Sequence, residues 1–211
     1  MGRRIEHTRK ISSDRVRKRR HPKKTILIAI EGNNKTEKTY FSNFENGKKS
    51  YNITYARGNN TDPLNLVRML IKEVNELKSE LADEVESYCI FDTDTDPNKN
   101  KIIAGAIQLA NRNNIKVITS TPCIELWFLL HYEYTTAYMN NKEVIRKLKT
   151  HYPKYEKNVN LYSDIVENLE SAIERAKRLE SYQLNNNHII GTVEANPNTE
   201  IYKIVERLMK K

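Results

Sequence analysis

Residues 25–32, Thr-Ile-Leu-Ile-Ala-Ile-Glu-Gly, form a continuous apolar run that ends at a carboxylate and a glycine. Such a run predicts a strand buried on both faces of a sheet and followed by a turn. Similar short runs predict further strands, and the full set is 25–30, 51–57, 87–91 and 115–119. The intervening segments have helical periodicity, over 35–46, 62–81 and 99–113. This alternation predicts an α/β protein with a mainly parallel four-stranded sheet and helices on both faces.

The C-terminal third of the chain has a different pattern. Residues 124–134 are apolar nearly all round and predict a buried helix, which completes a core over 25–138. Beyond it the only strand-like segment is a possible short strand at 188–193. Helices are predicted near 141–151, 164–181 and 198–210. Residues 139–211 are therefore expected to form a mainly helical extension that packs back on the core.

The positive charge is concentrated at the N-terminus. The chain has a formal net charge of +9, and residues 1–24 alone carry eleven Lys and Arg against two acidic residues. This basic arm has almost nothing apolar to bury, so it is predicted to be disordered when unbound. It is suited to binding nucleic-acid phosphates or an acidic partner, although a solvated tail that aids solubility is the alternative. The candidate nucleic-acid-binding residues are Arg15, Arg17, Lys18, Arg19, Arg20, Lys23, Lys24 and, outside the arm, Arg57.

Membrane and secreted classes are disfavoured. The longest aliphatic run, residues 26–30, is far shorter than the ~20 residues of a membrane helix. No apolar segment follows the basic N-terminus, so no secretory signal is visible. The two cysteines, Cys89 and Cys123, lie in apolar strand-like segments, as expected for core residues in a reducing compartment. We therefore expect a cytoplasmic protein.

Carboxylates collect where the predicted strands end. Glu31 follows the first strand, Asp92, Asp94 and Asp96 follow the third, and Glu125 follows the fourth. Ligands of open α/β sheets bind beyond these carboxyl ends. Asp92 and Asp94 are two apart and are expected to face the same side. Two carboxylates ~4 Å apart repel by about 1 kcal/mol in water and about 4 kcal/mol at an intermediate dielectric. Because no Lys or Arg lies between residues 91 and 98, a divalent cation such as Mg²⁺ is predicted to bind here.

Other interpretations of the Asp92–Asp96 segment are open. It could be a solvated turn in which Asp96 caps the next helix. A calcium-binding loop is excluded, because Pro97 and Ile103 stand where Gly and Glu are required. The segment also matches phosphatases in which a first Asp attacks phosphorus, but those enzymes carry the motif on their first strand.

Several segments resemble the RloB-like family. Residues Glu31-Gly-Asn-Asn-Lys-Thr-Glu37-Lys-Thr-Tyr40-Phe41 are similar to its EGxxTExxYF signature, with one extra residue before Thr36. The most specific match is Ser120-Thr-Pro122-Cys-Ile-Glu125-Leu-Trp127. Further matches are 57–63, 91–94 and 196–199, and the resemblance covers about residues 23–211.

This resemblance implies a Toprim-like (Rossmann-like) core and the effector subunit of an anti-phage abortive-infection system. It implies a metal-dependent nuclease and an ABC-type ATPase partner. Glu31 would be the catalytic general acid or base, and Asp92 with Asp94 would hold Mg²⁺ (or Mn²⁺). Glu125 is a further candidate metal ligand. Whether the substrate is DNA, tRNA or another RNA stays open. A non-catalytic adaptor of the same defence complex is the main alternative, and a phosphatase is a third.

Three other residues have more ordinary interpretations. Glu37 is expected in the first turn of a helix, where it interacts with the helix dipole or orients the preceding loop. Arg57 could contact phosphate or form a structural salt bridge. His131 could deliver a proton, but a core histidine with its hydrogen bonds satisfied is the simpler interpretation.

Overall fold

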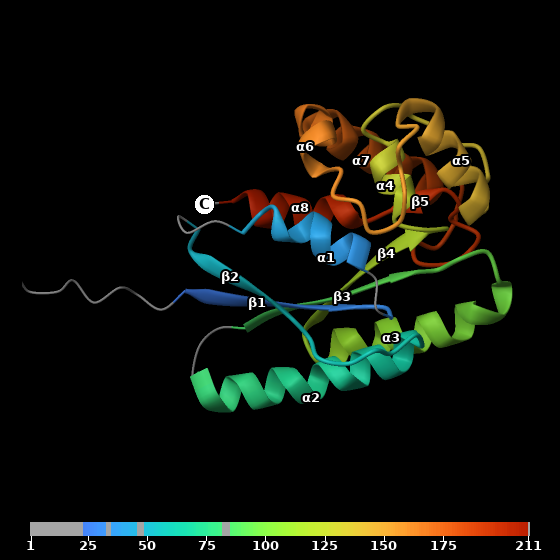
Figure 1. Ribbon diagram of the computed structural model, residues 1–211. Helices are drawn as coiled ribbons and strands as arrows, with labels where there is room; N and C mark the ends of the chain where they lie inside the picture. The colour runs from blue at the N-terminus through green and yellow to red at the C-terminus, as the bar shows by residue number, and fades with distance from the viewer. Residues whose placement is uncertain (1–22, 33–34, 46–48, 82–84, 211) are drawn as a thin grey trace, which may run out of the picture.

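The computed structural model describes residues 23–32, 35–45, 49–81 and 85–210, and within them one five-stranded sheet is formed (Figure 1). The strand order is β2-β1-β3-β4-β5. The strands are β1 Lys24–Ile30, β2 Tyr51–Tyr55, β3 Val85–Asp92, β4 Ile115–Thr121 and β5 Asn198–Thr199. The first four strands are parallel, and β5 runs antiparallel to β4. The predicted mainly parallel α/β sheet is confirmed.

Helices cover both faces of the sheet (Figure 1). One face packs on α2, Pro63–Leu81, and α3, Asn100–Arg112. The other packs on α1, Lys35–Ser42, on α4, Glu125–Leu129, and on α8, Ile201–Met209. All six residues from 25 to 30 in β1 are buried, which explains why that strand is continuously apolar.

The sheet has five strands, so the prediction of four was wrong. The additional strand, β5, lies at the start of the segment predicted as a helix over 198–210. It pairs with the end of β4, and the hydroxyl oxygens of Ser120 and Thr199 lie 2.8 Å apart. The possible strand at 188–193 is not formed. That segment consists of turns, and the Val193 amide donates to Asn100 Oδ1 at 3.2 Å, at the start of α3.

The C-terminal helices pack on the same core as the sheet. Helix α5 is Asn141–His151, as predicted. The helix predicted over 164–181 is divided into α6, Tyr162–Ile165, a 3₁₀ turn and α7, Leu169–Asn185. The buried helix predicted over 124–134 is shorter, because α4 ends at Leu129 and turns follow. A single cluster of buried apolar residues includes sheet residues such as Ile28 and C-terminal residues such as Ile204.

None of the helices in the described part of the chain is long and apolar enough to cross a membrane.

Candidate active site at the carboxyl ends of the strands

Glu31 and Asp92 meet where β1 and β3 end. The two strands are neighbours, and Ile30 pairs with Ile90 in their register. The Asp92 backbone amide donates a hydrogen bond to Glu31 Oε2 at 3.3 Å, and the Glu31 amide donates to the Ile90 carbonyl at 3.1 Å. Adjacent parallel strands thus bring together two carboxylates that are 61 residues apart in the sequence.

Glu125 begins α4 and lines the same pocket as Asp92. Its side chain is buried, and the Tyr155 hydroxyl donates a hydrogen bond to Glu125 Oε1 at 3.0 Å. A pocket of about 280 Å³ opens here. It is lined by three carboxylates, with a lysine and an asparagine from the segment between α5 and α6; the lining residues are Thr36, Glu37, Asp92, Ile124, Glu125, Lys157 and Asn158.

Asp92 is the electrostatic centre of this group. Burial raises its pKa well above the usual value, and the charges of Glu37, Glu125, Glu31 and Asp94 raise it further. Burial also raises the pKa of Glu31, although the hydrogen bond from the Asp92 amide acts in the opposite direction. A fold that concentrates carboxylates in this way must protonate one of them or bring a cation to them.

Asp94 is held differently from the other carboxylates. Strand β3 ends at Asp92, and Asp94 has a φ of 54°, so strand alternation no longer determines where its side chain points. Its Oδ2 forms an ion pair with Lys99, and its Oδ1 accepts a hydrogen bond from Asn141 Nδ2 at 2.9 Å. Asn141 is the first residue of α5, so the helical extension contacts this carboxylate directly.

Lys99 reaches Asp94 because a tight turn follows the acidic segment. Asp96 caps the 3₁₀ turn Pro97–Lys99 by accepting a hydrogen bond from the Asn98 amide at 3.0 Å, so its predicted capping role is confirmed. The hydrogen bond with Asp94 raises the pKa of the Lys99 ammonium. The sequence contains no cation between residues 91 and 98, but the turn returns the next residue, Lys99, to the acidic segment.

The most informative residue that sequence reasoning did not assign to this site is Glu37. It lies in the first turn of α1, is buried, and lines the pocket beside Asp92 and Glu125. A signal was present in the sequence: Glu37 precedes the buried residues Tyr40 and Phe41 by three and four positions, so it shares their helix face. Tyr155 and Asn141 carried no comparable signal.

The predicted nucleic-acid-binding residues within the described part of the chain do not line the acidic pocket. Lys24 is the first residue of β1, so Lys23 and Lys24 lie at the amino end of this strand, whereas Glu31 follows its carboxyl end. Arg15, Arg17, Lys18, Arg19 and Arg20 lie outside the described residues. Arg57 is exposed after β2 and lines a hollow against α2 with Lys72 and Glu73, and its backbone amide donates to Glu73 Oε2 at 2.9 Å.

His131 is a core residue in the structure. Its side chain is buried beneath α4, and its Nδ1 lies 3.0 Å from the Trp127 carbonyl oxygen. Burial lowers its pKa to about 4, which keeps the imidazole neutral near pH 7. His131 does not line the pocket that contains Asp92 and Glu125.

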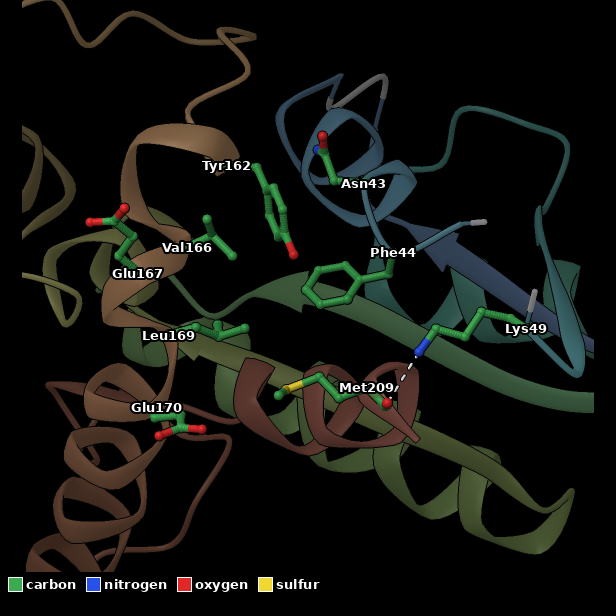
Figure 2. Close-up of a pocket in the computed structure, with 9 residues that line it drawn as sticks. All are labelled: Asn43, Phe44, Lys49, Tyr162, Val166, Glu167, Leu169, Glu170 and Met209. Carbon is green, nitrogen blue, oxygen red and sulfur yellow. Dashed lines mark hydrogen bonds between the residues drawn. The ribbon is translucent and has the colours of Figure 1, made fainter. Parts of the chain in front are cut away.

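A second hollow lies at the other end of α1. Figure 2 shows its nine lining residues, among them Phe44 and Tyr162, whose rings are in edge-to-face contact, and Met209 at the end of α8. Its volume is about 410 Å³. Lys49 closes one side by donating to the Met209 carbonyl at 3.1 Å. No carboxylate of the strand ends reaches this hollow, so we place the candidate site at the acidic pocket.

The chemistry of the acidic side chains suits a hard divalent cation, which prefers carboxylate oxygens. Asp92, with its pKa raised by burial and by the surrounding carboxylates, is the kind of group that such an ion would stabilise in the charged form. The arrangement of these acidic side chains is less favourable for binding a metal ion. Among the described residues, no group of three or more His, Cys, Asp or Glu side chains is placed to hold a metal ion. Both carboxylate oxygens of Asp94 are engaged by Lys99 and Asn141.

Comparison with known proteins places the chain in one family. A family model described as RloB-like protein matches residues 26–208, which is most of the chain. No curated protein and no solved structure matches it. The match includes most of β1, the carboxylates of the strand ends and most of α8. The chain therefore belongs to the RloB-like protein family.

Proposed function

We propose that this protein is a metal-dependent nuclease that hydrolyses phosphodiester bonds and that its sheet is a Toprim-like catalytic core. The observation that supports this most directly is the gathering of Glu31 and Asp92, at the ends of β1 and β3, with Glu125 at the start of α4. Parallel α/β sheets bind their ligands at this edge. The raised pKa of Asp92 marks the point where a compensating cation stabilises the site most.

The roles that we propose for individual residues are those that the resemblance to the RloB-like family implies. Asp92, Asp94 and Glu125 are the proposed ligands of Mg²⁺ or Mn²⁺, an ion that would neutralise charge on the phosphoryl oxygens. Glu31 is the proposed general acid or base, because burial moves its pKa toward the range in which a carboxyl exchanges protons near neutral pH. The hydrogen bond from the Asp92 amide orients the Glu31 carboxylate. Tyr155 orients Glu125 in the same way.

The biological setting that we propose comes from the family. The protein would act in the cytoplasm as the effector of an anti-phage abortive-infection system, together with an ABC-type ATPase. Its substrate would be a nucleic acid, either DNA or an RNA such as tRNA. The basic arm, residues 1–24, would supply phosphate contacts that raise the local concentration of nucleic acid without selecting a sequence.

A non-catalytic adaptor is the second candidate. It is favoured by one observation, the lack of a ligand group of three side chains placed for a metal among the described residues. In an adaptor, the acidic edge would bind a basic surface of the partner. The two candidates differ in how they respond to substitutions that preserve side-chain shape.

A cleavage panel tests the proposal. Plasmid DNA, single-stranded DNA and total tRNA would be incubated with the protein in Mg²⁺, Mn²⁺ or EDTA, with and without the co-expressed ATPase. We expect metal-dependent cleavage that falls at least 100-fold in Glu31→Gln and in Asp92→Asn, since general acid–base catalysis alone contributes about 10²–10⁴-fold. Glu76→Gln, an exposed carboxylate on α2, is the matched control and should cleave normally.

The outcome also separates the two candidates. An adaptor would retain phage protection in Asp92→Asn and lose it when arm charges are removed. Absence of cleavage in every condition, combined with full protection by Asp92→Asn, would overturn the nuclease proposal.

A further inference from the structure

Both oxygens of Asp94 are engaged by groups of this chain. Lys99 Nζ forms an ion pair with Oδ2, and Asn141 Nδ2 donates to Oδ1 at 2.9 Å. The side chains of Lys99 and Asp94 are 36% and 39% exposed, so the ion pair is accessible from solvent. The site therefore already contains a cation, supplied by a residue five positions after Asp94.

The backbone holds Lys99 in this position. The Lys99 amide donates to the Asp96 carbonyl at 3.0 Å, within the 3₁₀ turn that Asp96 caps. The ammonium also acts on Glu31, because its charge lowers the pKa of that carboxyl. Lys99 thus offsets the negative charge of two carboxylates, Asp94 after β3 and Glu31 after β1.

We propose that Lys99 is a built-in counter-ion that holds Asp94 and must leave it before a divalent cation binds. Lys99 would thereby set the metal affinity of the site. The inference rests on the proposed function in assuming that the acidic edge is a metal site. It accounts for the engagement of Asp94 by a cation of this chain at an acidic edge whose side chains suit a divalent ion.

Electrostatics determine the direction of the effect. An ammonium about 6 Å from a divalent ion in a water-like dielectric repels it enough to change the binding constant about tenfold. Replacing Lys99 by a neutral side chain removes this repulsion and releases Asp94 Oδ2. An exposed ion pair often contributes little to folding stability, so the substitution should leave the fold intact.

The experiment measures Mn²⁺ binding to the metal-free protein by isothermal titration calorimetry, with Mn²⁺ paramagnetic resonance as an independent readout. We expect Lys99→Gln to bind Mn²⁺ about tenfold more tightly than the parent protein. Lys99→Arg retains the charge and should bind as the parent does. Lys101→Gln removes the same charge from an exposed position of α3, two residues away, and should change the affinity less than twofold.

A double variant locates the effect. In the Lys99→Gln background, Asp94→Asn should abolish the gain in affinity, because the released carboxylate oxygen is then absent. Circular dichroism melting of each variant establishes that it is folded before titration.

Each outcome decides a separate question. Equal or weaker Mn²⁺ binding by Lys99→Gln than by a parent protein that binds the ion overturns this inference and leaves the metal site of the proposed function standing. Binding by Lys99→Gln alone supports the inference. Failure of every variant to bind Mn²⁺ overturns both this inference and the metal-dependent part of the proposed function.

Discussion

Asp92 lies at the end of β3 and is surrounded by other carboxylates. Its backbone continues β3, and its amide hydrogen-bonds Glu31. Its side chain lies among the carboxylates that raise its pKa. In the folded protein the protonated form of Asp92 is thus favoured more than in the unfolded chain, where an Asp has a pKa of about 3.9. The Asp92 carboxylate is therefore destabilising when no cation is present.

The sign of this effect predicts the pH dependence of stability. Because the pKa is raised by folding, the unfavourable contribution of Asp92 is absent below about pH 4 and develops as the pH rises through the elevated value. Without metal, Asp92→Asn should therefore increase the free energy of unfolding at pH 7, by on the order of 1 kcal/mol. Urea denaturation in EDTA at pH 4 and pH 7 measures the difference, which should disappear at pH 4. A less stable Asp92→Asn protein at pH 7 would contradict this account, and Glu76→Gln is the control.

At the scale of the element, the N-terminal cap of α5 positions a residue that contacts the acidic site. Asn140 caps α5 in a reciprocal capping box: its side chain accepts from the Glu143 amide at 3.0 Å, and the Glu143 carboxylate accepts from the Asn140 amide at 2.8 Å. This box starts the helix immediately before Asn141, which contacts Asp94. The cap of α5 thus also positions Asn141 for its hydrogen bond with Asp94.

Removing this cap should lower the stability of the protein measurably. Asn140→Ala leaves N-terminal amides of α5 without an acceptor and should lower the free energy of unfolding by about 1 kcal/mol. The measurement is thermal or urea unfolding. Lys142→Ala, an exposed position on the same helix, should change stability by less than about 0.5 kcal/mol. Equal effects of the two substitutions would show that the box does not stabilise the helix.

At the scale of the whole molecule, the sheet and the C-terminal helices form one core. Ile204 and Val205 of α8 are fully buried in the same apolar cluster as Ile28 of β1 and Trp127 of α4. The segment between α5 and α6 also contributes Tyr155, Lys157 and Asn158 to the acidic site. The C-terminal part therefore supports the sheet and completes the pocket at its carboxyl edge.

This shared core predicts cooperative unfolding. Ile204→Ala should reduce the free energy of unfolding by about 2–5 kcal/mol, the usual cost of truncating a buried isoleucine. Ile189→Ala, at a position that is 72% exposed, should have an effect below about 0.5 kcal/mol. Urea denaturation followed by tryptophan fluorescence and by circular dichroism should give one coincident transition in each protein. Two separate transitions would mean that the C-terminal helices unfold independently.

Sequence patterns alone predicted four of the five strands and part of the site. The continuous apolar run of β1 reflects a strand covered on both faces, whereas β2, also identified from the sequence, alternates buried and exposed residues. Parallel strands end at one edge, so the order of strands and carboxylates along the chain was enough to place Glu31 and Asp92 together. The Asp96 cap and the bounds of α5 follow from local hydrogen bonding, which depends on neighbouring residues alone.

The remaining features depend on tertiary packing. Strand β5 has two residues, too few for any periodicity, and it forms because α8 and the preceding turns bring it to β4. The contacts of Asp94 with Asn141 and of Glu125 with Tyr155 join residues 47 and 30 positions apart. Such contacts depend on how the C-terminal helices lie over the edge of the sheet, and that is determined by the packing of the shared core and by no local pattern of residues.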